Sequence, residues 1–211
     1  MKNRLLLTIQ AASAFYLLSS TLAAETGKPL LLQAGNGAIS FDAATNFSAV
    51  SVHGKANTLQ TRVRVRQDAR QLIVEEVNAK LPAGALSTGM GLRDEHMKKY
   101  IFTTADGQVP DLKFSGENQA CALEPGKEAV CKFSGKLTVR GVERPFNLAM
   151  KIKQDGAAYR AAGDGLVKLS DYGIERPSQF GVQCADEVKV HIEFLVREVQ
   201  ESTSRAGGGT Q

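Results

Sequence analysis

Residues 135–153 read GKLTVRGVERPFNLAMKIK, and this stretch sets the expected fold class. Apolar residues occupy every second position on both sides of a break that contains Gly141 and Pro145. They are Leu137 and Val139 before the break, and Phe146, Leu148, Met150 and Ile152 after it. A period of two places alternate side chains on opposite faces of a sheet, and Gly and Pro favour a turn. The stretch therefore predicts two antiparallel strands with one apolar face and one face of Lys and Arg.

The same alternation recurs along the rest of the chain. Strands are expected at 38–41, 49–59, 61–66, 72–77, 112–119, 130–139, 159–169 and 187–197. Gly54 is expected to interrupt the second of these. One helix is expected at 91–101, because no β-branched residue precedes Ile101 and because Asp94 and Lys98 complement the helix dipole. The sequence thus predicts an all-β domain with one short α-helix.

About eight hairpin-connected strands are best accommodated in a closed antiparallel barrel, which removes exposed sheet edges. The charged strand faces point outward in such a barrel, which excludes a membrane barrel with an apolar outer band. The interior is then apolar. A barrel of this size either fills itself with side chains or holds a small ligand, and alternation alone does not distinguish the two.

The first 24 residues have the charged, apolar, small-residue order of a secretory signal peptide. Lys2 and Arg4 precede an apolar stretch at 5–18, and the segment ends in Ala23 and Ala24. A membrane anchor is the alternative, but the apolar run falls short of the ~20 residues that span a bilayer. The sequence therefore predicts an exported, periplasmic protein.

The predicted mature chain is a single domain at 25–199 followed by a polar, Gly-rich, disordered tail at 200–211. The full chain of 211 residues carries 26 Lys and Arg against 22 Asp and Glu, and two of the cations belong to the leader. The mature chain is therefore close to neutral. This balance argues against a nucleic-acid partner, which usually selects a concentrated basic patch.

The three cysteines are Cys121, Cys131 and Cys184. The first two lie symmetrically about Gly126, and a hairpin turn there would bring their Cα atoms within disulfide range. Three free buried thiols are the alternative. We expect the Cys121–Cys131 bridge, with Cys184 left free. No Cys or His pair has metal-ligand spacing, so no metal is expected.

Catalysis has little support in the sequence. No GxSxG, HExxH or phosphate-binding glycine loop is present. The segment 93–96, Arg-Asp-Glu-His, is the most chemically suggestive one, and a solvated helix face with internal ion pairs is its alternative interpretation. We expect a protein that is not an enzyme and that needs no cofactor.

Four stretches of the sequence are together more specific than any one of them alone. They are FSAVSVHG at 47–54, TGMGLRDEHM at 88–97, GKLTVRGV at 135–142 with Pro145 following, and LSDYGI at 169–174. In content and order they resemble the YceI family of exported, lipocalin-like barrels. The resemblance implies that the barrel holds a polyisoprenoid chain, such as a quinone tail. The chain departs from the family pattern at Arg140, Leu169 and Tyr172, where the family commonly has His, Arg and Phe.

The resemblance implies a ligand in contact with the apolar wall and with a polar cluster at the mouth. The expected ligand-binding residues are Val50, Val52, Val74, Phe114, Phe133, Leu137, Val139, Phe146, Leu148, Met150, Ile152, Val188, Val190, Ile192, Phe194, Arg93 and His96. We expect an apolar lipid as partner, an encounter with a membrane surface or a partner protein, and a monomer or homodimer. The alternatives are a filled barrel that acts through its surface and an enzyme that acts on a lipid.

Overall fold

The structure, a computed structural model, describes residues 29–68, 71–123 and 126–199. The predicted leader, 1–24, and the predicted tail, 200–211, lie outside these ranges. Within the described ranges, no helix has the length and apolarity needed to cross a membrane.

Strands β5 (Glu128–Val139) and β6 (Val142–Asp155) form the hairpin that the opening alternation predicts. Their two-residue turn is Arg140-Gly141, and both residues have positive φ, at 53° and 78°. Leu148 is buried whereas Ala149 beside it is exposed, so successive side chains face opposite sides of the sheet. The pattern of apolar residues therefore decides which face of the hairpin points inward.

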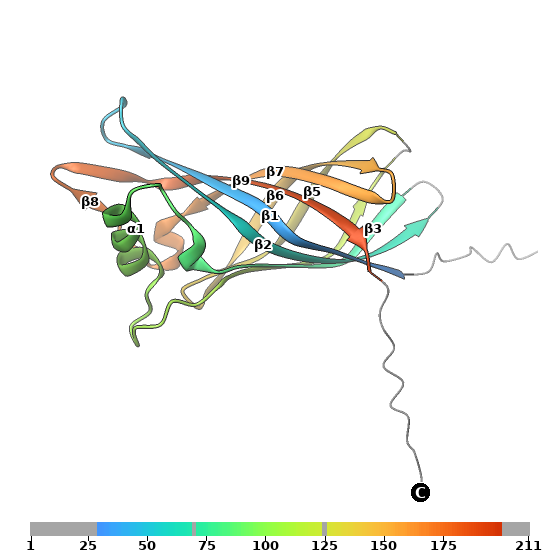
Figure 1. The fold of residues 1–211 in the computed structure, drawn as a ribbon, viewed down its shortest axis with the longest axis horizontal. Helices are drawn as coiled ribbons and strands as arrows, with labels where there is room; N and C mark the ends of the chain where they lie inside the picture. Colours follow the sequence, from blue (N-terminus) through green and yellow to red (C-terminus); the bar gives the residue numbers. More distant parts are fainter. Residues whose placement is uncertain (1–28, 69–70, 124–125, 200–211) are drawn as a thin grey trace, which may run out of the picture.

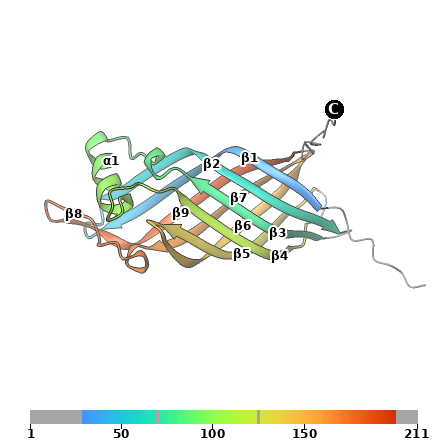
Figure 2. The same cartoon turned by 90° about the horizontal axis from the view of Figure 1, so that it is seen from below.

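Eight long antiparallel strands form one closed barrel, and a two-residue strand, β8, pairs with the last of them (Figures 1 and 2). The other strands are β1 (Pro29–Thr45), β2 (Ser51–Asp68), β3 (Gln71–Leu81), β4 (Leu112–Cys121), β7 (Ala158–Lys168), β8 (Ser178–Gln179) and β9 (Val182–Glu198). The long strands pair in chain order, and β1 also pairs with β9 to close the barrel. The predicted fold class, an antiparallel lipocalin-like barrel of about eight strands with one α-helix, is confirmed.

Strand boundaries are where the sequence prediction was wrong. The sequence predicts two segments at 49–59 and 61–66 with an interruption at Gly54, but β2 is continuous. Gly54 lies directly opposite Phe41 of β1, and a Cβ at position 54 would meet the Phe41 ring. The glycine therefore gives room to an aromatic ring and does not end the strand. Strands β1 and β9 are also longer than the predicted segments at 38–41 and 187–197.

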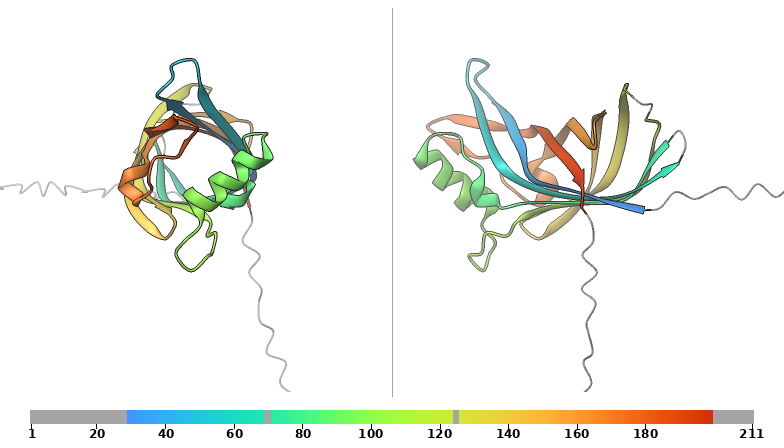
Figure 3. Two further views of the ribbon diagram at one scale, coloured as in Figure 1. Left: turned by 90° about the vertical axis from the view of Figure 1, so that its left-hand side faces the viewer. Right: turned by 45° about the vertical axis from the view of Figure 1, so that its right-hand side comes forward.

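The predicted helix at 91–101 forms in two parts, α1 (Gly91–Met97) and a wider turn, η2 (Lys98–Phe102). Two short 3₁₀ turns, η1 (Ala83–Ala85) and η3 (Leu169–Tyr172), accompany them. All four lie at the same end of the barrel, together with the β8–β9 hairpin (Figures 1 and 3). This is expected, because the connections that follow β1, β3, β5 and β7 emerge at one end of an up-and-down barrel.

We call this the open end, formed by residues 46–50, 82–111, 140–141 and 169–181. At the opposite, packed end the interior side chains are almost fully buried, and Val65 and Val74 are 0% and 2% exposed. Interior residues of β9 nearer the open end, such as Val190 and Ile192, remain partly accessible. Burial near the open end is uneven, since Leu81 and Tyr172 are only 2% and 4% exposed.

Candidate functional site

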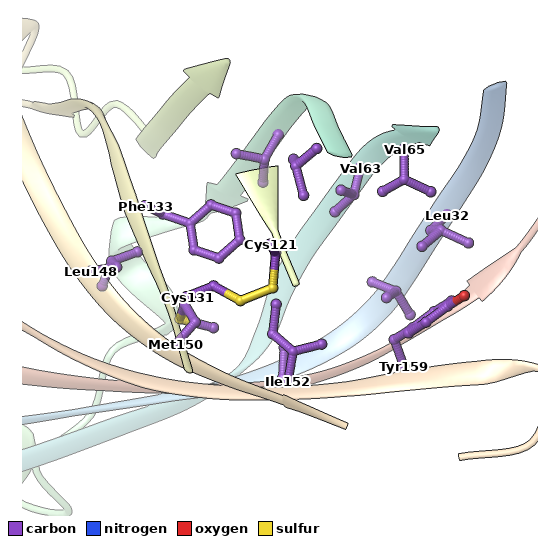
Figure 4. Packing of buried hydrophobic residues seen from close by; sticks show 14 of the residues in the cluster. Leu32, Val63, Val65, Cys121, Cys131, Phe133, Leu148, Met150, Ile152 and Tyr159 are labelled. Atoms are coloured by element: carbon purple, nitrogen blue, oxygen red, sulfur yellow. A yellow bond between two sulfur atoms is a disulfide. The ribbon is translucent and has the colours of Figure 1, made fainter. Parts of the chain in front are cut away.

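A cavity of about 1300 Å³ occupies the barrel interior. Side chains from all eight long strands line it, and residues of α1, η2 and the β8–β9 hairpin line its mouth at the open end. Figure 4 shows apolar side chains from several neighbouring strands that point into this interior. Because its walls are apolar, an apolar molecule can replace water there favourably.

The structure places every ligand-binding residue predicted from the sequence on the lining of this one cavity. These residues are Val50, Val52, Val74, Phe114, Phe133, Leu137, Val139, Phe146, Leu148, Met150, Ile152, Val188, Val190, Ile192, Phe194, Arg93 and His96. Their role in binding stays a prediction. The sequence analysis left out other lining residues, including Val63, Val65 and Tyr159. The alternation of Val63 and Val65 with arginines was the signal that could have placed those two on the wall.

Two aromatic rings shape the middle of the wall. Phe114 of β4 and Phe146 of β6 meet edge to face, with ring centroids 6.1 Å apart. Each ring lies over a glycine of the neighbouring strand, because a Cβ built at Gly135 or Gly165 would come within 2.5 Å of ring carbon Cζ of Phe114 or Phe146. The two glycines therefore give these rings room against the neighbouring strands.

One buried hydroxyl interrupts the apolar lining. Thr61 is 1% exposed, and its Oγ1 atom has no hydrogen-bond partner among the described residues. Tyr159 lies on the same lining, and burial raises the pKa of its phenol. Neither group is charged at neutral pH. The deep cavity therefore offers a long ligand chain an almost purely apolar surface.

Several charged or titratable side chains gather at the mouth. Arg93 and His96 of α1, Arg140 of the β5–β6 turn and Arg176 before β8 all line the open end of the cavity. Arg93 donates a hydrogen bond to the Met90 sulfur. Arg140 holds a left-handed backbone conformation that an L-residue other than Asn or Asp rarely adopts. The sequence analysis missed Arg140 as a site residue, although its place before Gly141 in a tight hairpin was visible.

Asp94 anchors α1 to the barrel. Its carboxylate accepts hydrogen bonds from the Ser87 hydroxyl at 2.6 Å, the Thr88 hydroxyl at 2.6 Å and the Thr88 backbone N–H at 2.7 Å. These bonds hold the pKa of Asp94 below its ordinary value. Ser87 is itself paired through its backbone with Lys55 of β2. Asp94 thus fixes the helix that carries Arg93 and His96 over the mouth.

The predicted disulfide is confirmed. Cys121 and Cys131 are bonded, with Cα atoms 5.6 Å apart, and both are buried at the packed end. Cys184 is free and half-buried, as expected, and it lines the cavity near the mouth. Burial raises the pKa of its thiol, so Cys184 is mainly protonated at neutral pH and is a poor nucleophile.

A chain of contacts on the outer face has the order of a hydrolase triad and was missed by the sequence analysis. Ser51 Oγ lies 2.6 Å from His53 Nε2, and His53 Nδ1 contacts Asp42. The His53 and Asp42 side chains are 67% and 52% exposed, whereas a catalytic aspartate is buried so that it can stabilise the imidazolium. A second exposed pair, His191–Asp164 at 2.8 Å, has the same cross-strand origin. Both are best explained as pairing between facing strand residues.

Among the described residues, no group of three or more His, Cys, Asp or Glu side chains is placed to hold a metal ion.

The family assignment follows from a match between residues 32–196 and the YceI-like domain family, which spans the entire barrel. The chain belongs to the YceI-like family. A comparison with curated proteins found no match.

Solved structures with the same fold are distant in sequence. BcnA from Burkholderia cenocepacia matches with a TM-score of 0.56 at 16% identity, over 75% of this chain and 95% of BcnA. A polyisoprenoid-binding domain from Saccharophagus degradans, implicated in plant cell wall breakdown, matches with a TM-score of 0.59 at 12% identity, over 81% of this chain and 99% of that domain. At these identities the likeness establishes the YceI-like barrel.

Proposed function

We propose that this YceI-like protein is an exported, non-enzymatic carrier that holds a long isoprenoid or a similar apolar lipid inside its barrel. The observation that carries the proposal is the apolar cavity of about 1300 Å³ that opens at one end. Pockets for small ligands are commonly about 300–1000 Å³, so this cavity is large enough for an extended chain. A barrel that acted only through its surface would have no use for such a space.

The energetics suit a ligand without directional chemistry. Each buried methylene-sized group contributes about 0.8 kcal/mol when it leaves water, and an isoprenoid chain has many such groups. The aromatic and aliphatic walls supply contacts along the length of the barrel. The polar end of the ligand would then lie at the mouth, beside Arg93 and His96 of α1.

Export is supported by two independent features. Residues 1–24 have the order of a signal peptide, and the Cys121–Cys131 disulfide is of a kind that persists in oxidising compartments. An isoprenoid is insoluble in the periplasm, so a protein that shields its tail can keep it in solution. Such a carrier would meet a membrane surface or a partner protein when it loads and unloads, as a monomer or a homodimer.

The test is organic extraction of the protein purified from its own periplasm, followed by mass spectrometry. We expect about one isoprenoid lipid for each protein molecule. Arg93→Ala and His96→Ala are expected to weaken lipid retention. No enzymatic reaction is expected to be lost in either variant. Extracts without lipid, combined with no rise in melting temperature on addition of isoprenoids, would contradict the proposal.

A lipid-acting enzyme is the alternative to a carrier, and although the Ser51–His53–Asp42 chain is best explained as cross-strand pairing, it is the arrangement on which such an activity can be tested. Ser51→Ala separates the two candidates. If hydrolysis of a long-chain ester by the wild type is lost in this variant, the carrier proposal is replaced. If the variant retains lipid like the wild type and no ester turnover is detectable in either protein, the hydrolase is excluded.

A further inference from the structure

Exposed apolar side chains form a rim around the mouth of the cavity. Among the described residues, six of the large apolar side chains that remain exposed belong to segments of the open end. They are Phe47, Val50, Met90, Leu92, Tyr100 and Phe180. They come from the β1–β2 loop, the α1–η2 region and the β8–β9 turn, which surround the open end in Figure 3. Monomeric soluble proteins seldom gather apolar side chains in this way unless the patch meets another apolar surface.

Phe180 is the clearest member of the rim. Its side chain is 96% exposed, and its backbone has a φ of 51° at the tip of the β8–β9 hairpin. Together with Gly181 at 81° it forms a two-residue turn of the kind that prefers Asn-Gly or Asp-Gly. A phenylalanine there costs backbone strain and gains no packing within the chain. A large apolar residue at a turn position that prefers Asn or Asp therefore points to a contact outside the chain.

The rim is continuous with the cavity. Five of the six rim residues also line the cavity, with Phe47 as the exception. An apolar path therefore runs from the outer surface of the rim into the barrel. A lipid that passed along this path would keep contact with apolar atoms and would avoid most of the cost of crossing water.

Cations lie beside the rim. Lys98 and Lys99 follow α1, both are exposed, and the Lys99 ammonium lies 5.2 Å from the centre of the Tyr100 ring. Neither lysine forms an ion pair with another described residue. Lysines next to exposed aromatic and aliphatic side chains match the layered chemistry of a bilayer, which presents phosphates above acyl chains.

We propose that the open end docks on the surface of a phospholipid bilayer, with the rim inserted and the cavity mouth facing the lipid. This inference deepens the proposed carrier function and rests on it. A second copy of the chain is the other occupant that would cover the rim. A two-fold contact through this end would gather the Lys98 and Lys99 pairs of both copies, which disfavours that arrangement.

The chain contains no tryptophan, so Phe180→Trp introduces a single fluorophore at the rim. We expect its emission to shift to the blue on addition of vesicles of phosphatidylethanolamine and phosphatidylglycerol, and to be quenched when the acyl chains are brominated. Val130→Trp is the matched control, because Val130 is 70% exposed on β5 toward the packed end. Its emission should not change. Equal quenching at both positions, or at neither, would overturn the proposal.

Phe180→Asn separates docking from folding. Asn-Gly is the preferred pair for this turn, so the variant should fold at least as well as the wild type while its vesicle partitioning falls about tenfold or more. Lys98→Gln and Lys99→Gln should each weaken partitioning about fivefold. Unchanged partitioning in Phe180→Asn would contradict docking. So would a wild-type dimer that this variant dissociates, without vesicle binding by either protein.

Lipid content, measured on the same preparations, distinguishes the two proposals. If the wild type carries an isoprenoid and does not bind vesicles, the docking inference fails and the carrier function stands. If it binds vesicles through the rim and never carries a lipid, the carrier function fails and the docking surface stands.

Discussion

At the scale of single residues, the described part of the inner wall contains a fully buried hydroxyl without a partner, that of Thr61, and the outer wall contains several polar pairs. Thr61 faces the cavity with its Oγ1 atom unbonded, whereas Thr45 near the β1–β2 loop bonds the carbonyls of Phe47 at 3.0 Å and Val50 at 2.8 Å. A buried polar group without a partner destabilises the folded state. The two threonines should therefore respond in opposite ways to loss of the hydroxyl.

We predict that Thr61→Val raises the free energy of unfolding of the lipid-free protein by up to about 1–2 kcal/mol, because the unbonded hydroxyl is removed. Thr45→Val should lower it by about 1 kcal/mol, because the hydroxyl's contacts with the Phe47 and Val50 carbonyls and with the Phe47 backbone N–H are lost. Urea denaturation of both variants measures the difference. A destabilised Thr61→Val protein would mean that the hydroxyl has a partner in solution.

The sequence alone predicted well which side chains face the barrel interior. It predicted poorly which polar side chains pair on the outer face. Alternation in β6 and β9 tells which side chains face inward, since the period of a strand is fixed by its backbone. The contact between Asp42 and His53 depends on the register of β1 against β2, which the sequence pattern does not give. The same lack of register information concealed the Ser51–His53–Asp42 chain.

At the scale of elements, small residues decide how closely strands and rings approach. Gly54 and Gly135 each lie under an aromatic ring, of Phe41 and Phe114 respectively. In the sequence alone, a glycine within an alternating segment indicates a break in the strand. For this reason β2 was predicted as two segments. Only the position of the neighbouring ring shows that the glycine is a packing requirement.

We predict that Gly135→Ala lowers the free energy of unfolding by about 1–3 kcal/mol, because its Cβ would overlap the Phe114 ring and force the wall apart. Gly84→Ala is the control, since nothing lies within 4 Å of a Cβ at that position and its φ is not positive. Thermal unfolding of both variants measures the effect. Equal stability of the two variants would contradict this view of the wall.

The α1 region depends on pH through Asp94. Its pKa is held below the ordinary value of 3.8 in the folded state, so its contribution to stability is present above that pH and is lost as pH falls through the folded-state pKa. We predict that Asp94→Ala lowers the melting temperature at neutral pH, and that the gap to the wild type narrows as pH is taken below about 4. A gap that stays constant with pH would show that the Ser87 and Thr88 hydrogen bonds to the carboxylate contribute nothing.

At the scale of the whole molecule, the barrel and its cavity differ in how far the sequence predicts them. Closure follows from about eight alternating, hairpin-connected strands, since an open sheet would leave two edges unpaired. The alternation does not predict whether the barrel is hollow, because Leu148 and Val190 would face inward in a filled barrel as well. The cavity depends on how the inward-facing side chains pack, including the rings of Phe114 and Phe146. Family resemblance, rather than periodicity, predicted the hollow barrel.

The central claim is that one long apolar lipid occupies this cavity, and native mass spectrometry of the intact protein tests it most directly. We predict a population heavier than the bare chain by the mass of one isoprenoid lipid. Leu148→Glu should lose the added mass, because a carboxylate facing the lipid would be buried without a partner.

Ala149→Glu places the same charge on the exposed face of the same strand and should keep the added mass. Circular dichroism of both variants shows whether the barrel is intact. A wild-type spectrum with only the bare mass, or an added mass that survives in a folded Leu148→Glu protein, would contradict the account.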